Sequence, residues 1–305
     1  MTDLGKMRIS RRTAIAAMTG AAGLARAQKK SLNFTARATP SLCLYSEAVK
    51  VDYNDSGPFI QAMGFDGIEL AVVPGGHIPL EGDIDLHLER AVEAMTGSGL
   101  EVPVLSTTIT SVQAKEVQSI MGWGSEMHVP IFSPGQWPRS GDGAASTLRA
   151  QREMSMLVQV GNAAHMQIAV HNATPAFVGS SIADLNTAIQ PFDKILGFNY
   201  DAGFAAAYSG TAPDAANAAF HTALPRLKML TVRDCKWTKA EDGSQALTQC
   251  PLGEGMVDWQ QLFTALAKAN FIGPITLRVE YSEELSAIRK DLAFLKKQRS
   301  AAYEG

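Results

Sequence analysis

Residues 195–203 read ILGFNYDAG, a short apolar run that ends on the carboxylate of Asp201 and then turns through Gly203. The run has the length and composition of a buried strand. A strand that delivers one charged group at its carboxyl end is how an α/β barrel presents a catalytic or metal-binding side chain. A carboxylate that caps a turn is the alternative for any single case, so the other strand ends have to be compared with this one.

Other apolar runs along the chain carry polar side chains in the same way. They are GIEL at 67–70 with Glu69, QIAVHN at 167–172 with His171, LTVRD at 230–234 with Arg233 and Asp234, and PITLRVEY at 274–281 with Glu280. Because the carboxyl ends of parallel barrel strands meet at one face, the pattern predicts that these groups share one mouth.

Strand-like and helix-like segments alternate from Ser41 to the end of the chain. The predicted strands cover 41–45, 68–72, 101–109, 128–132, 166–171, 195–201, 227–233 and 273–281. Helices with one apolar stripe separate most of them, at 85–96, 146–164 and 182–189 for example. Eight such units predict a closed (β/α)8 TIM barrel in the α/β class.

The composition of the chain argues against some classes of binding partner. The 305 residues carry a formal net charge of -3, which argues against nucleic-acid binding, because that function needs a basic surface. No apolar run after residue 27 is long enough to span a membrane. We therefore expect a small-molecule partner, and the sequence leaves the oligomeric state open, a homo-oligomer included.

The first 40 residues are not predicted to belong to the folded domain. Arg11 and Arg12 precede a mildly apolar stretch, and Ala25-Arg26-Ala27 fits a small-residue cleavage site. This pattern predicts a twin-arginine signal peptide at 1–27, a linker at 28–40, a barrel domain at 41–305 and export to the periplasm. An amphipathic helix or a disordered tail is the alternative.

The chain has three cysteines, at 43, 235 and 250. Cys235 and Cys250 flank a polar stretch, and an oxidising compartment would allow them to pair. Buried, unpaired thiols are the alternative, and the sequence does not choose between the two.

Three blocks near the C-terminus carry a family resemblance: PLGEGMVDW at 251–259, FIGPIT at 271–276 and VEY at 279–281. They resemble the signature of the sugar phosphate isomerase/epimerase family, within the xylose isomerase-like TIM barrel superfamily. GIEL at 67–70, DAGF at 201–204 and VRD at 232–234 match other blocks of that family in order. The leader fits an exported branch of it.

The resemblance implies a divalent metal at the barrel mouth that polarises a sugar carbonyl or hydroxyl while side chains move a proton through an enediolate. It implies Asp201, Glu280 and His171 as metal ligands, with Glu280 and His171 also catalytic. His171 is then either the third ligand or the base.

The resemblance further implies that Glu69, Arg233 and Asp234 contact substrate. His77 is added as a substrate-binding residue because the glycines before it, at 75 and 76, let its loop approach a ligand closely.

The chain departs from the family pattern where histidines are expected. Phe204 and Thr231 stand at two such positions and Ala173 at a third. Oxygen-rich sites suit Mg²⁺ or Mn²⁺ better than Zn²⁺, so we expect one of the former.

The sequence therefore predicts a carbohydrate isomerase or epimerase-like enzyme, or a related keto-sugar lyase or hydratase. The alternative is a non-catalytic sugar-binding barrel with a degenerate metal site. The endonuclease branch of the superfamily needs a histidine-rich zinc cluster and a basic track, and six histidines with a negative net charge argue against it.

Overall fold

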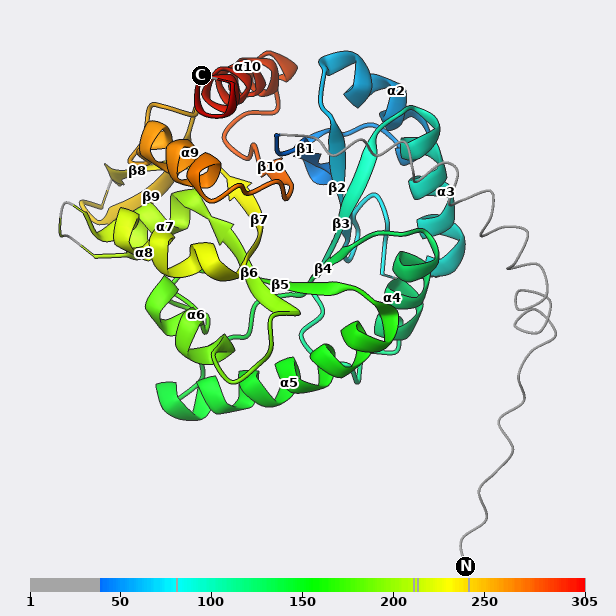
Figure 1. Cartoon of the computed structure of the whole chain (residues 1–305), viewed down its shortest axis with the longest axis horizontal. Coiled ribbons are helices and arrows are strands. Elements are labelled where there is room, and N and C mark those ends of the chain that lie inside the picture. The colour runs from blue at the N-terminus through cyan, green and yellow to red at the C-terminus, as the bar shows by residue number, and fades with distance from the viewer. Residues whose placement is uncertain (1–38, 81, 211, 213, 241, 305) are drawn as a thin grey trace, which may run out of the picture. The chain divides into compact units, whose positions relative to one another are not determined.

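A closed barrel of eight parallel strands, surrounded by helices, forms the body of the protein (Figure 1). The computed structural model describes residues 39–304 except 81, 211, 213 and 241. The strands follow the order β1-β10-β7-β6-β5-β4-β3-β2, every neighbouring pair is parallel, and β1 pairs with β2 to close the ring. This confirms the predicted (β/α)8 fold. The predicted signal peptide and all but the last two residues of the predicted linker lie outside the described residues.

The barrel strands are β1 (Leu42–Tyr45), β2 (Gly67–Val72), β3 (Glu101–Thr107), β4 (Ile131–Ser133), β5 (Gln167–His171), β6 (Leu196–Asp201), β7 (Leu227–Val232) and β10 (Ile275–Leu277). The α-helices are α2 (Tyr53–Met63), α3 (Ile84–Gly97), α4 (Glu116–Glu126), α5 (Gly143–Ala164), α6 (Ile182–Ile189), α7 (Ala202–Tyr208), α8 (Ala215–Ala223), α9 (Trp259–Lys268) and α10 (Leu285–Tyr303). Short 3₁₀ turns η1 (Ser46–Ala48) and η2 (Leu224–Arg226) precede α2 and β7.

Side-chain caps fix where most of these helices begin. Asp52, Asp83, Asp142, Ser181, Asp201 and Asp258 each accept a hydrogen bond from a backbone N–H in the first turn of the following helix. Two boundaries differ from the sequence prediction. The pattern of residues 110–121 predicts a helix, which begins only at Glu116, and the strand expected to reach Tyr281 ends at Leu277. None of the described helices is long and apolar enough to cross a membrane.

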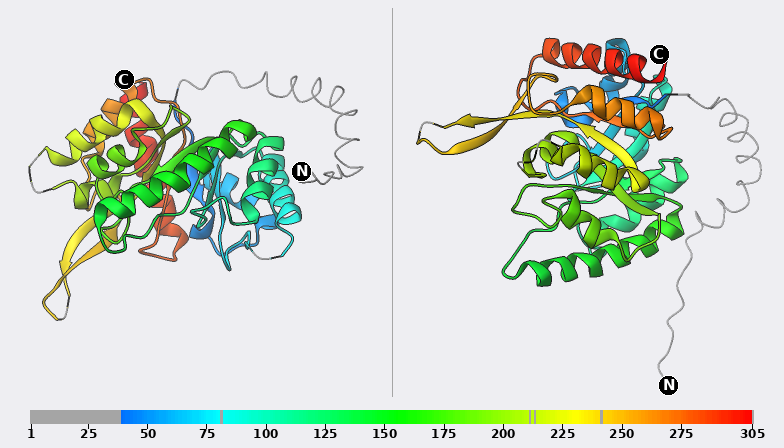
Figure 2. Two further views of the ribbon diagram at one scale, coloured as in Figure 1. Left: turned by 90° about the horizontal axis from the view of Figure 1, so that it is seen from below. Right: turned by 60° about the vertical axis from the view of Figure 1, so that its left-hand side comes forward.

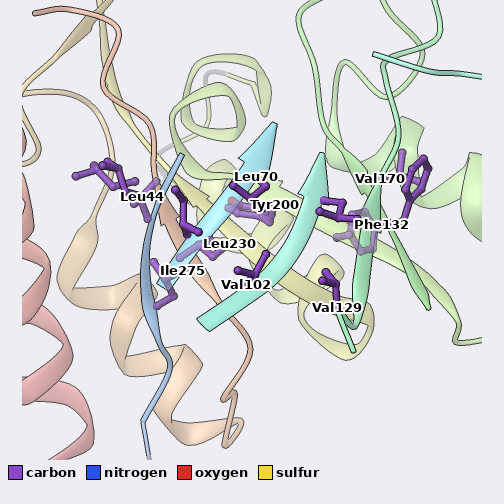
Figure 3. Close-up of a cluster of buried hydrophobic side chains, with 14 of the residues drawn as sticks. Leu44, Leu70, Val102, Val129, Phe132, Val170, Tyr200, Leu230 and Ile275 are labelled. Carbon is purple, nitrogen blue, oxygen red and sulfur yellow. The ribbon is translucent and has the colours of Figure 1, made fainter. Parts of the chain in front are cut away.

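The main core lies between the barrel and its helices. Strand side chains alternate between two faces, and the outward ones are large and apolar, among them Leu44, Leu70, Phe132, Val170 and Leu230 (Figure 3). All five are nearly inaccessible to solvent. Burial of this kind stabilises a fold by about 25 cal/mol per Å² of apolar surface removed from water, so this layer supplies most of the favourable free energy of folding.

The inward faces carry a small apolar cluster of Val104, Ile131, Ala169 and Met229. Two residues further along the same strands stand Ser106, Ser133, His171 and Thr231, all buried and all polar. Since residues two apart share a face of a strand, an apolar floor lies beneath a polar layer toward the carboxyl ends. The barrel interior is therefore closed below and polar at its mouth.

A two-stranded antiparallel hairpin, β8 (Asp234–Lys239) with β9 (Gln245–Cys250), follows β7 and projects away from the barrel (Figure 2). It was not predicted, because its residues are polar and show no clean alternation. The Gln249 side chain ties it to the body: its amide nitrogen donates to the Arg278 carbonyl at 2.6 Å, and its oxygen accepts from the Glu280 N–H at 2.6 Å. The hairpin thereby holds the segment that follows β10.

Asp234, the first residue of this hairpin, is fully buried and anchors the PLGEG loop. Its carboxylate accepts hydrogen bonds from the backbone N–H groups of residues 235, 253, 255 and 257 and from the indole N–H of Trp259, at 2.9–3.2 Å. A Cβ atom at Gly255 would lie 2.1 Å from Asp234 Oδ1, which explains the glycine. The loop is therefore built around this one carboxylate.

We predict that Asp234→Asn lowers the free energy of unfolding by about 3 kcal/mol, because an amide group turns donors toward N–H groups that need a charged acceptor. Urea denaturation with Asp242→Asn as the control measures this, since Asp242 is an exposed residue of the hairpin turn. Equal stability of the two variants would contradict the anchoring role.

All three cysteines are buried and unpaired in the structure. In the hairpin, Cys235 stands opposite Gln249, and Cys250 stands opposite Asp234. Adjacent residues of a strand point to opposite faces, so the two thiols lie on opposite sides of the ribbon. This register disfavours the disulfide left open by the sequence.

We predict that the denatured, unreduced protein shows three free thiols by titration with a chromogenic thiol reagent. The Cys235→Ser variant should show two. A wild-type count of one would mean that the bridge forms and that the hairpin register is different.

Candidate active site

A cavity of about 330 Å³ opens at the carboxyl ends of the barrel strands, a volume suited to one small molecule. Its polar lining comes from the ends of five strands or from the loops that follow them. The polar lining residues are Tyr45, Ser106, Thr107, Thr108, Ser133, Gln136, His171 and Arg278. Among the described residues no carboxylate side chain lines the cavity, and Arg278 gives its wall a fixed positive charge.

His171, the last residue of β5, connects this cavity to a buried carboxylate. Its Nε2 lies 3.2 Å from Asp201 Oδ2, and its Nδ1 lies 3.0 Å from the amide nitrogen of Gln136. His171 and Gln136 both line the cavity, whereas Asp201 is completely buried behind the ring. The imidazole is thus held from both sides, with one nitrogen toward the cavity lining.

Asp201 is contacted by groups from several elements at the mouth. Burial alone would raise the pKa of its carboxyl, but the nearby Arg233 charge, the contact with His171 and the N–H of Phe204 outweigh burial and lower that pKa. The Asn172 side chain fixes the backbone here, because it donates to the Asp201 carbonyl at 3.1 Å and accepts from the Asp201 N–H at 2.7 Å. Asp201 is therefore a fixed, ionised carboxylate at neutral pH.

Arg233, which directly follows β7, lies between two acids. Its Nε is 2.8 Å from Asp201 Oδ2, and its Nη1 is 2.9 Å from Glu280 Oε2. The guanidinium also stacks on the Phe204 ring, with Cζ 4.7 Å from the ring centroid. Only 6% of the Arg233 side chain is exposed, compared with 57% of Glu280. Arg233 does not line the cavity.

Arg278 occupies the equivalent place after β10 and belongs to a second pair. Its Nη2 lies 2.5 Å from Oε1 of the fully buried Glu69, and its Cζ lies 4.0 Å above the Tyr45 ring. Burial would lower the pKa of Arg278, but the charge and hydrogen bond of Glu69, together with Tyr45 and Asp201, outweigh burial and raise it. Arg278 is accordingly a permanent cation held in a fixed plane at the cavity wall.

Three buried polar atoms among the cavity-lining residues lack a hydrogen-bond partner within the described part of the chain. They are Ser106 Oγ, Arg278 Nε and His171 Nε2, and His171 Nε2 has the 3.2 Å ion-pair contact with Asp201 Oδ2. Buried polar groups in folded proteins are nearly always hydrogen-bonded. Ser106 Oγ and Arg278 Nε therefore indicate a cavity that accepts a polar, hydroxyl-bearing or anionic molecule.

The structure brings together four of the predicted site residues: His171, Asp201, Arg233 and Glu280 contact one another in series. Glu69 lies below Arg278 rather than in the cavity lining. His77 is held by Glu47, which accepts from its backbone N–H at 3.0 Å, and does not line the cavity.

The contacts of Asp234 show a structural role, and its predicted contact with substrate stays a prediction. Its two carboxylate oxygens are both saturated by the donors of the PLGEG loop and of Trp259. No oxygen of Asp234 is left to receive a ligand.

The predicted divalent metal does not fit these residues. A cation bound by Asp201 and Glu280 would have to lie where the guanidinium of Arg233 already contacts both carboxylates, and two positive charges repel each other. Across the described ranges, no three His, Cys, Asp or Glu side chains converge as metal ligands. The expected metal ligands Asp201, Glu280 and His171 form an ion-pair chain with Arg233 in this structure.

Of the polar cavity-lining residues the sequence prediction found only His171, and it missed Arg278, Gln136 and Ser106 among others. A signal was present for Arg278, because it follows an apolar strand run in the same way as Arg233. Ser106 shares a strand face with the floor residue Val104, two positions earlier. No local pattern marks Gln136, which lies in the loop after β4.

Comparison with known proteins agrees with this architecture. Residues 58–298 match the family model described as xylose isomerase-like TIM barrel. A search of the curated proteins finds no match.

Several solved structures are similar at low sequence identity. A xylose isomerase-like TIM barrel protein from Mycobacterium smegmatis, solved in complex with magnesium, is 15% identical with a TM-score of 0.66, and the match covers 87% of this chain and 97% of that chain. The 3-keto-D-glucoside 4-epimerase from E. coli is 16% identical with a TM-score of 0.65, over 85% of this chain and 99% of that chain. Mannonate dehydratase from Streptococcus suis is 12% identical with a TM-score of 0.67, over 87% and 93%.

At these identities the structural matches establish the fold alone. The family model, in contrast, spans well over half of the chain. This protein belongs to the xylose isomerase-like TIM barrel family.

Proposed function

We propose that this protein is a carbohydrate isomerase or epimerase-like enzyme that uses His171 to move a proton next to a sugar carbonyl. One observation carries the proposal: His171 lines the cavity while the buried, ionised Asp201 holds its other face. The similar structures include a 3-keto-D-glucoside epimerase and a mannonate dehydratase, which supports a small carbohydrate as substrate.

The two neighbours of His171 favour one tautomer of its neutral ring. An ionised carboxylate only accepts hydrogen bonds, so the ring nitrogen facing Asp201, Nε2, carries the proton. Nδ1 is then an acceptor and receives the amide N–H of Gln136. A substrate that displaces this amide meets a lone pair on Nδ1, and Asp201 stabilises the imidazolium that forms when the base takes a proton.

Arg278 is the group best placed to stabilise the negative oxygen that this proton transfer creates. Removing a proton beside a carbonyl places charge on the carbonyl oxygen, which becomes part of an enediolate. A fixed guanidinium with an unpartnered, buried Nε supplies charge and a donor there without reorganising. Glu69 and Tyr45 hold the plane of Arg278 by ion pairing and stacking.

His171 and Arg278 could together catalyse either isomerisation or epimerisation. If His171 returns the proton to the neighbouring carbon, with the hydroxyl proton moving in the opposite sense, the product is the isomeric carbonyl sugar. If the enediolate turns over in the cavity before His171 returns the proton, the original carbon receives it on its other face and the product is an epimer. Neither outcome needs an external oxidant or reductant, because the proton and the electron pair stay within the substrate and the base.

The second candidate is a sugar-binding barrel without catalysis. The replacement of the expected metal site by an arginine favours it, since metal polarisation is a large part of the chemistry that the resemblance implies. The cavity would be the same, but a bound sugar would not exchange protons with solvent.

We predict that His171→Gln lowers the rate of solvent-deuterium incorporation into bound keto sugars by at least about 100-fold, the usual contribution of a general base. Asp201→Asn should lower it similarly, because the ring would lose the carboxylate that orients it. Proton NMR of a panel of keto sugars in D₂O measures both. His221→Gln, which alters an exposed histidine of α8, is the control and should behave as wild type.

A wild-type protein that binds sugar without any exchange would refute the enzyme and leave the binding barrel. Exchange that survives His171→Gln would move the base to another residue.

A further inference from the structure

We infer that Arg233 permanently takes the place of a metal ion at the centre of this mouth, so that the protein excludes divalent cations there. The inference concerns which positive charge neutralises Asp201 and Glu280. It rests on the geometry of these residues and does not depend on the proposed reaction.

The position of the guanidinium is the first support. Asp201 ends β6 and Glu280 lies three residues beyond β10, and these two acids are the ones that the resemblance assigns to a metal. Arg233 contacts Asp201 through Nε at 2.8 Å and Glu280 through Nη1 at 2.9 Å. One planar cation therefore bridges two carboxylates that would otherwise repel each other.

The residues that replace the expected histidines provide the second support. Phe204 supplies the ring on which the Arg233 guanidinium stacks. Thr231 is short, and its hydroxyl donates to Asn199 Oδ1 at 2.8 Å, away from the ion pairs. Phe204 and Thr231, which stand in place of two expected histidine ligands, therefore leave room for the Arg233 guanidinium beside Asp201.

The backbone at Gly203 leaves space for the Arg233 side chain. A Cβ atom at Gly203 would lie 2.7 Å from Cγ of Arg233 and 2.8 Å from its carbonyl oxygen, so the side chain passes over a position that only glycine leaves free. Both the ring below the guanidinium and the space beside its stem are therefore provided by residues 203 and 204. Arg233 is a fitted component of the site.

The experiment uses Mn²⁺ alone as the probe, with binding followed by electron paramagnetic resonance of the free ion and by the shift in melting temperature. The wild-type full chain should not bind Mn²⁺ at Asp201, so Asp201→Asn should leave its Mn²⁺ binding unchanged. The melting temperature of the wild type should not respond to Mn²⁺ or to EDTA. Arg233→Gln removes the charge and frees Asp201, Glu280 and the face of His171. It should gain Mn²⁺ affinity by at least tenfold and be stabilised by the ion.

Two further variants make the comparison specific. Arg233→Lys keeps the positive charge and should stay without Mn²⁺ affinity. The double variant Arg233→Gln with Asp201→Asn should lose the affinity gained by the single change, because one of the two freed carboxylates is gone. Circular dichroism confirms that each variant compared is folded.

Wild-type binding of one Mn²⁺ with a raised melting temperature, abolished by Asp201→Asn, would overturn the inference. So would a folded Arg233→Gln protein without any gain in affinity. If Arg233→Gln does not fold, the wild-type measurement decides alone. None of these readouts uses catalysis, so an inactive protein would refute the proposed function and leave this inference standing.

Discussion

The mouth of this barrel depends on keeping the fully buried carboxylate of Asp201 ionised. Burying such a charge without partners would cost several kcal/mol, and three groups offset that cost: the guanidinium of Arg233, the imidazole of His171 and the N–H of Phe204. These partners come from β5, from the end of β7 and from the first turn of α7. Satisfying one carboxylate therefore fixes three elements relative to one another, and the catalytic proposal and the cation inference both follow from that arrangement.

Because side chains alternate along each of the eight barrel strands, one face of a strand stabilises the fold and the other can carry functional groups. Outward positions such as Leu44 and Leu230 pack under the helices, whereas inward positions change from apolar to polar within two residues. A hydrogen-bonded series from Thr231 through Asn199 to Ser133 crosses β7, β6 and β4 in the polar layer. The functional groups thus stand on a rigid support, which suits a site whose cation and base are held by ion pairs.

The sequence was sufficient for the fold because periodicity is a local signal and eight βα units allow few topologies. It also located His171, Asp201, Arg233 and Glu280 at one mouth. It could not show how they pair. The contact of Arg278 with Glu69 joins residues 209 positions apart, and the direction taken by the Arg233 side chain depends on a ring and a glycine of α7. The contacts of Asp234 with its loop and of Arg233 with two carboxylates are of the same kind, and they leave no periodic pattern in the sequence.

The contacts of Gln249 limit where residues can be inserted in the projecting hairpin. The two ends of its amide join β9 to the backbone on either side of residue 279, within the segment that carries Arg278 and Glu280. Because side chains alternate along a strand, one residue inserted between the turn and Gln249 within β9 would rotate that amide to the opposite face. Insertions at the exposed turn around residues 242–244 would leave the pairing intact. Relatives of this chain should therefore differ in the length of the hairpin tip and agree in the spacing from Gln249 to the barrel mouth.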